Sequence, residues 1–102
     1  MTTYIALGKW TDQGAHTIDE SPRRLDAAKR QLEQMGGRLM TFYMTMGEYD
    51  MVVVYETPDD ATAARFLLLL GSSGAVRTTT MKAYPEQAYR EIVASLRTGA
   101  TG

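Results

Sequence analysis

The sequence contains no cysteine and a single histidine, His16, among its 102 residues. The missing cysteines exclude disulfides, thiolate metal ligands and thiol catalysis. The one histidine is the only side chain whose ordinary pKa lies near neutrality. The formal net charge is −1, and charges of both signs are scattered along the chain. Because binding to phosphates needs a clustered basic surface, we do not expect nucleic acid as a partner.

Long apolar runs are also missing. The longest, residues 51–55 and 66–70, are far shorter than the roughly 20 residues that span a membrane. The N-terminus has neither the basic start nor the apolar stretch of a signal peptide, so we expect a cytoplasmic protein with no membrane partner. The composition is that of one globular domain, predicted over residues 1–97. Residues 98–102 have nothing to bury and are predicted to be a disordered tail.

A β-hairpin is the clearest local signal. Residues 38–46 and 51–56 are both rich in β-branched and aromatic side chains, and a short segment joins them. In that segment Gly47 can adopt a positive φ and Asp50 can bond its own backbone, which suits a chain reversal. Two such runs joined by such a segment predict a hairpin of two antiparallel strands.

The remaining elements can be placed around this hairpin. Ser21-Pro22 and Thr57-Pro58 each predict a helix start, with a hydroxyl cap followed by proline at the first helical position. The spacing of apolar residues predicts a strand over 3–10, a helix ending at Gly36-Gly37, a helix over 61–70 and a strand over 75–84. It also predicts a last helix whose apolar stripe consists of Tyr89, Ile92, Val93 and Leu96. The order β-α-β-β-α-β plus a C-terminal helix predicts an α+β, ferredoxin-like sandwich with a four-stranded antiparallel sheet.

Neither face of the hairpin is polar enough for water. In the first strand of the hairpin, the alternation of side chains predicts one face with Met40, Phe42, Met44 and Met46, and an opposite face with Leu39, Thr41, Tyr43 and Thr45. In the second strand, it predicts one face with Val52 and Val54, and an opposite face with Met51, Val53 and Tyr55. A second subunit covering the outer face is the favoured explanation; the alternative is a semi-polar face with scattered exposed Thr and Tyr. Residues 66–70 are apolar all round, so this helix should be covered on more than one side, as in a ring or filament.

Four segments carry a family resemblance: Trp10-Thr11-Asp12-Gln13-Gly14, Ser21-Pro22-Arg23-Arg24-Leu25, Met46-Gly47-Glu48-Tyr49-Asp50 and Val76-Arg77-Thr78-Thr79-Thr80. Together they resemble the GYD domain family over about residues 3–96, with Glu48 inserted in the Gly–Tyr–Asp element. The resemblance implies a dimeric α/β barrel, in which the sheets of two copies pair face to face. It implies no established activity. Related barrel families include cofactor-independent enzymes whose ligand lies between sheet and helices, an analogy at the level of fold alone.

Several residues are candidates for a ligand site, because a pocket for a small hydrophobic compound is lined by aromatic rings with few polar groups. They are Trp10, His16, Tyr43 and Tyr49. For Trp10 and Tyr43, pocket and core are equally compatible with the sequence, whereas Tyr4 and Tyr55 fit the core better. His16 is either a catalytic base or, as we favour, a solvated loop residue, because no carboxylate partner stands at a fixed spacing. For Tyr49 we favour an interface or a pocket wall.

The charged candidates have simpler explanations. Glu48 and Asp50 are able to act as acid and base or to bind a cation, but with Gly47 they fit better as turn or interface residues. Arg23-Arg24, with Arg77 and Lys82, would suit an anionic ligand, although ordinary surface charge is favoured. No metal site and no cofactor are expected from these patterns.

Two functions remain open at this point. The favoured one is a binding or accessory module without catalysis of its own, acting as a homodimer or higher homo-oligomer. The alternative is a cofactor-independent enzyme of the oxygenase, isomerase or cyclase type that acts on a small hydrophobic or aromatic compound.

Overall fold

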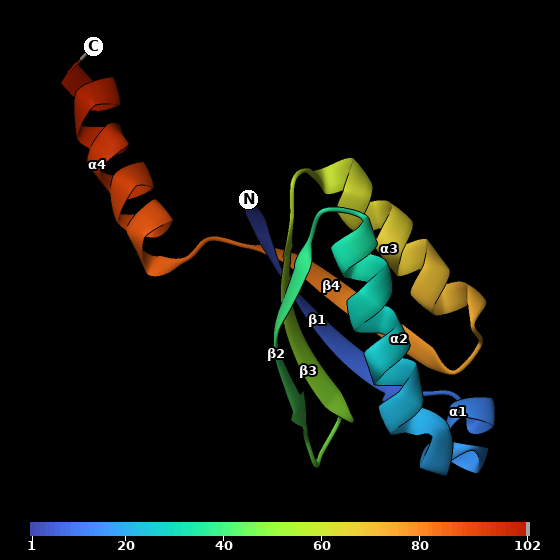
Figure 1. Ribbon diagram of the computed structural model, residues 1–102. Helices are drawn as coiled ribbons and strands as arrows, with labels where there is room; N and C mark the ends of the chain where they lie inside the picture. Colours follow the sequence, from blue (N-terminus) through green and yellow to red (C-terminus); the bar gives the residue numbers. More distant parts are fainter. Residues whose placement is uncertain (102) are drawn as a thin grey trace.

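The protein folds as one antiparallel sheet with helices on one face (Figure 1). The computed structural model describes residues 1–101, with side chains up to residue 97. The strands are β1 (Thr2–Trp10), β2 (Arg38–Met44), β3 (Met51–Thr57) and β4 (Val76–Ala83). The helices are α1 (Asp12–His16), the 3₁₀ helix η1 (Ile18–Glu20), α2 (Ser21–Gln34), α3 (Asp60–Ser72) and α4 (Glu86–Thr101). The strand order is β2-β3-β1-β4, which confirms the predicted ferredoxin-like fold.

The core lies between the sheet and the helices α2 and α3, which cover one of its faces. Tyr4 and Tyr55 are register partners on β1 and β3, and their rings stack with centroids 5.4 Å apart. Phe66 of α3 meets Tyr55 edge-on at 5.2 Å, and Leu32 of α2 is fully buried. Burying an apolar side chain such as Leu32 or Phe66 stabilises the fold by roughly 1.5–3 kcal/mol. The core placement of Tyr4 and Tyr55 is confirmed.

The predicted cap of the first long helix is wrong. Ser21 is the first residue of α2, and the preceding Glu20 makes no side-chain capping bond. The reason is η1, which leads directly into α2: Ser21 already has helical φ and ψ and donates its N–H to the carbonyl of Ile18. A capping hydroxyl needs extended backbone, which this tight turn does not provide.

The second predicted cap moves by two residues. Asp59, not Thr57, caps α3: one carboxylate oxygen accepts from the Thr62 N–H at 2.8 Å and from the Thr62 hydroxyl at 2.7 Å. Thr57 instead donates its hydroxyl to the Asp59 carbonyl at 2.6 Å. Asp59 has the extended backbone of a cap residue, and Pro58 precedes this cap instead of following it.

A β-bulge at Met40 makes the predicted face of Leu39 wrong, whereas the predicted separation of Phe42 and Met44 from Thr41 and Tyr43 is confirmed. Leu39 pairs with Tyr55, and Thr41 pairs with the adjacent Val54, so Met40 is an extra residue. Such an insertion shifts the alternation of side chains by one position. Leu39 therefore shares the helix-covered face with Phe42 and Met44, whose register partners on β3 belong to that face. The prediction for β3 itself is confirmed, since its odd-numbered residues face the helices.

The hairpin turn is formed as expected. Gly47 has a φ of +133°, a conformation that favours glycine. The strand β2 ends at Met44, two residues earlier than predicted, and the Thr45 N–H then donates to the Asp50 carbonyl at 2.9 Å.

The last helix extends away from the rest of the molecule (Figure 1). The Cα radius of gyration is 16.1 Å, against about 13 Å for a compact domain of this length. The predicted disordered tail at 98–102 remains a prediction: α4 is assigned as far as Thr101, but the side chains from 98 onward and residue 102 lie outside the described residues. None of the helices described is long and apolar enough to cross a membrane.

Candidate functional site

A small cavity of about 90 Å³ lies between the sheet and the helices α2 and α3. Its lining comes from all four strands and both long helices, and includes Ala6, Leu25, Phe42, Val53 and Leu70. These side chains are nearly all apolar. The cavity occupies the place where a ligand pocket is expected from the resemblance.

Trp10 and Arg24 stand at the polar end of this cavity. The Arg24 guanidinium lies 5.9 Å from the centre of the Trp10 ring, a cation–π geometry. It also donates from Nη1 to the Thr17 carbonyl and hydroxyl, both at 3.1 Å, and from Nη2 to the Gly14 carbonyl at 3.3 Å. Arg24 therefore ties α2 to the connection that contains α1. The sequence offers no periodic signal for this role, because the partners lie in the connection between β1 and α2, outside the helix that carries Arg24.

The four predicted ligand residues do not meet at one site. Trp10 lines the cavity. Tyr43 pairs with Val52 on the other face of the sheet, where it is 63% exposed. His16 is exposed at the end of α1, and Tyr49 lies in the hairpin turn with Lys9 Nζ 5.2 Å from its ring centre. A pocket shared by Trp10, Tyr43 and His16 is thus not formed within one chain.

The turn residues fasten the hairpin to β1. Asp50 accepts from the Trp10 N–H at 2.9 Å through its carboxylate, and its own N–H donates to the Gly8 carbonyl at 2.8 Å. The Tyr49 carbonyl accepts from the Thr45 hydroxyl at 2.6 Å, while Glu48 is exposed. These contacts support the interpretation of Gly47, Glu48 and Asp50 as turn residues. Among the described residues no cluster of three potential metal-ligating side chains occurs.

Two titratable side chains line the cavity, Arg24 and Tyr55. Burial raises the pKa of Tyr55 to about 12. A tyrosine that stays protonated cannot accept a proton near neutral pH, and a guanidinium offers hydrogen-bond donors but no acceptor. The Tyr55 and Thr80 hydroxyls are both buried and form no hydrogen bond of normal geometry among the described residues, although Thr80 is close enough to offset part of the rise in the pKa of Tyr55.

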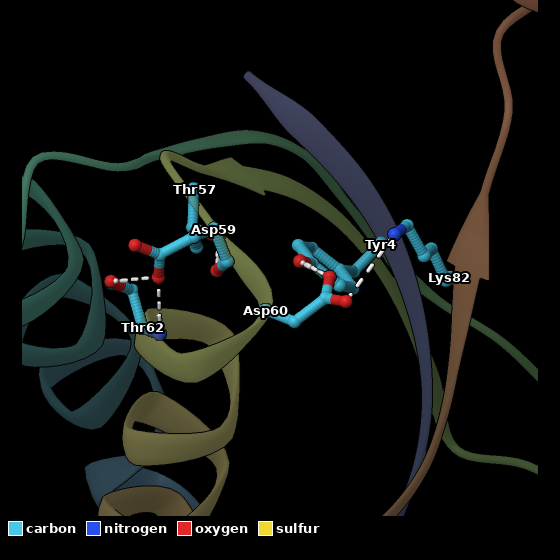
Figure 2. A network of polar contacts seen from close by, with 6 residues as sticks. All are labelled: Tyr4, Thr57, Asp59, Asp60, Thr62 and Lys82. Atoms are coloured by element: carbon cyan, nitrogen blue, oxygen red, sulfur yellow. Dashed lines mark hydrogen bonds and ion pairs between the residues drawn. The ribbon is translucent and has the colours of Figure 1, made fainter.

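A polar network joins the start of α3 to the sheet (Figure 2). The Tyr4 hydroxyl donates to Asp60 Oδ1 at 2.5 Å, and Lys82 Nζ lies 3.3 Å from Asp60 Oδ2. The hydrogen bond from Tyr4 is the largest cause that lowers the pKa of Asp60, and the bond to Asp60 raises the pKa of Lys82. The network connects β1, β4 and α3, which is a structural role, and it accounts for Lys82 without an anionic ligand.

The sheet face opposite the helices is apolar at its centre. Because Tyr4 and Ala6 point to the core, their neighbours Ile5 and Leu7 point the other way. Register partners place six apolar residues together there, which we call the open face: Ile5, Leu7, Tyr43, Val52, Val54 and Met81. Charged residues such as Lys9, Arg77 and Glu56 lie around them. An apolar centre with a polar rim is typical of a protein interface.

These features define a class: a ferredoxin-like α+β domain with a small apolar cavity and an uncovered apolar sheet face. Two solved structures share the fold. A crystal structure described as FFRP-DM1 has a TM-score of 0.57 and 22% identity, covering 82% of this chain and 100% of that one. A hypothetical protein of Pyrococcus horikoshii, PHS023, has a TM-score of 0.53 and 21% identity, covering 83% of this chain and 92% of that one.

The chain belongs to the GYD domain family, whose model matches residues 4–93. A protein of Thermus thermophilus is 42% identical over 86 residues, which cover 83% of this chain and 90% of that protein. That relative is named glutamine synthetase and cystathionine beta-lyase binding protein.

Proposed function

We propose that this protein is a non-catalytic binding module that attaches to a metabolic enzyme, with glutamine synthetase and cystathionine β-lyase as its first candidate partners. The observation that carries the proposal is the 42% identity, over nearly the whole length of both chains, to a protein named for binding these two enzymes. The structure offers the surface that such a role needs, because apolar side chains remain uncovered on both sides of the domain.

Catalysis in the cavity has less support. The two titratable side chains that line it are unable to serve as a base near neutral pH, as argued above. The volume is also small: an apolar cavity of about 150 Å³ is what binds benzene in an engineered protein, whereas this one has about 90 Å³. An aromatic substrate would therefore require the lining to move, and the cofactor-independent enzyme remains the second candidate.

The two apolar surfaces of the domain suit two different partners. The open face pairs with the open face of a second copy, which gives the face-to-face homodimer that the resemblance implies. The outer side of α3, where Leu68 is 74% and Leu69 is 42% exposed, contacts the enzyme. This division agrees with the expectation that a helix apolar all round is covered on more than one side.

Calorimetric titration with the two purified enzymes of the source organism tests the proposal directly. We expect saturable binding to at least one of them, weakened at least tenfold by Leu68→Glu on α3. The matched control is Gln31→Glu, an equally charged change at an exposed position of α2, which should leave the affinity unchanged. Absence of binding to both enzymes would overturn the proposed partners.

Homodimer formation is tested separately. Val54→Lys at the centre of the open face should convert the dimer to a monomer in native mass spectrometry, because a buried unpaired charge is strongly disfavoured. A wild-type protein that is monomeric at micromolar concentration would show that the open face has another use.

A further inference from the structure

The helix α4 carries an apolar stripe that no other described residue of its own chain covers. The stripe consists of Tyr89, Ile92, Val93 and Leu96, whose exposed fractions range from 46% for Ile92 to 66% for Leu96. A shallow groove along the helix is lined by α4 residues alone. In Figure 1 the helix lies to the left of the sheet, while α2 and α3 lie to its right.

The polar contacts of α4 that we describe run along the helix itself. Arg90 pairs with Glu86 at 2.7 Å, and the Gln87 amide donates to Glu91 at 3.2 Å. Both pairs have the i, i+4 spacing of helix neighbours, which stabilises a helix only slightly. The stripe is thus the part of α4 that requires a partner, since most of the stability of a helix in a protein comes from packing of its apolar face.

The total surface of the chain indicates how much contact is missing. The chain exposes 6968 Å², against roughly 5,700 Å² for a compact monomer of 11.3 kDa. The excess is on the order of 1,200 Å². A stable interface buries about 800 Å² on each partner, so the uncovered surface is large enough for a dimer contact.

We infer that α4 is an exchanged arm, which packs its stripe against the body of a second copy of this chain while the second copy returns the same contact. A second copy is favoured because α4 extends on the open-face side of the sheet, where a copy paired through that face would stand within its reach (Figure 1). Two-fold pairing makes both arms equivalent and closes the assembly at two chains. The position of the arm rests on the proposed pairing of open faces, but the contact does not depend on enzyme binding.

The first experiment measures assembly. Ile92→Glu with Leu96→Glu places two charges in the stripe, and Gln87→Glu with Ala94→Glu places the same charges elsewhere on the helix. In sedimentation velocity the stripe variant should dissociate at a protein concentration at least tenfold higher than the wild type, while the control should match the wild type. A stripe variant that remains as dimeric as the wild type overturns the arm and leaves open-face pairing intact. A monomeric wild type overturns both.

The second experiment does not require a destabilised variant. A photo-reactive phenylalanine in place of Tyr89 is incorporated into both ordinary and ¹⁵N-labelled chains, which are then mixed, irradiated and digested. Cross-linked peptides that join a light α4 to a heavy body are expected. Cross-links within chains of one isotope alone would show that α4 folds back on its own domain, which overturns the inference. Calorimetry with the enzymes, performed on the same samples, reports the proposed function independently.

Discussion

Gly14 provides a sharp test of how the connection after β1 is held in place. This residue lies buried in α1, and a Cβ added to it would stand 2.0 Å from the carbonyl oxygen of Ala75. That oxygen accepts the Thr11 N–H at 3.1 Å, and the Thr11 hydroxyl donates to the Gly74 carbonyl. The added Cβ is the side-chain atom nearest the backbone, and the atoms that it meets are the main-chain atoms of Ala75. No side-chain rotation can therefore relieve the overlap.

The cost of Gly14→Ala follows from these contacts. The new Cβ must move by about 1.4 Å to reach an ordinary 3.4 Å contact. Overpacking of this kind costs about 1–3 kcal/mol, and the two hydrogen bonds of Thr11 contribute about 0.5–1.5 kcal/mol each. We expect a loss of about 3 kcal/mol in the free energy of unfolding. For a domain of this size, that corresponds to a Tm lower by about 12–24 °C.

Differential scanning calorimetry is the assay, with Gly71→Ala as the matched control. Gly71 lies in α3 and a Cβ there meets nothing within 4 Å. Since alanine is the better helix former by about 1 kcal/mol, this variant should melt several degrees above the wild type. A Gly14→Ala variant that melts within 2 °C of the wild type (about 0.5 kcal/mol) would refute the close approach on which the reasoning depends.

Three further predictions concern the buried tyrosines and their partners. Tyr55→Phe removes a buried hydroxyl that forms no hydrogen bond of normal geometry, so the urea midpoint should rise by the equivalent of about 1 kcal/mol with an unchanged m value; a fall would show that the hydroxyl is bonded to Thr80, which offsets part of the rise that burial causes in the pKa of Tyr55. Tyr4→Phe removes the bond to Asp60 and should lower the midpoint at pH 7. Because the pKa of Asp60 is lowered in the folded state, its contribution is present above the ordinary value near 3.8 and is lost as the pH falls through the folded-state pKa. The difference between wild type and Tyr4→Phe should therefore shrink between pH 5 and pH 2 (the range in which carboxylates titrate), and a constant difference would contradict this.

The fold was largely predictable, because its signals are local. The hairpin at Gly47, the proline-marked helix starts and the apolar spacing of the helices give the correct element order, and the core pair Tyr4 and Tyr55 follows from it. The bulge at Met40 was missed because nothing in the composition of β2 marks an extra residue; it becomes visible only when β3 is paired beside it.

The candidate site was less predictable than the fold. Trp10 lines the cavity and Tyr43 points to the other face of the sheet, so the two predicted ligand residues lie apart. The roles of Arg24 and Gly14 escaped sequence reasoning, since each depends on a carbonyl oxygen supplied from outside its own helix. Such contacts have no sequence period.

By itself, the sequence determined which elements form and in which order, because helix and strand periods, glycine turns and prolines act over a few neighbouring residues. It also determined that two apolar surfaces, one on the sheet and one on the helix at residues 66–70, need to be covered. Only the tertiary structure decided which side of the sheet α2 and α3 cover, and that α4 reaches away from its own domain. The physical reason is that burial depends on which segments distant in the chain come together. An apolar stripe specifies the need for contact but not the chain that provides it.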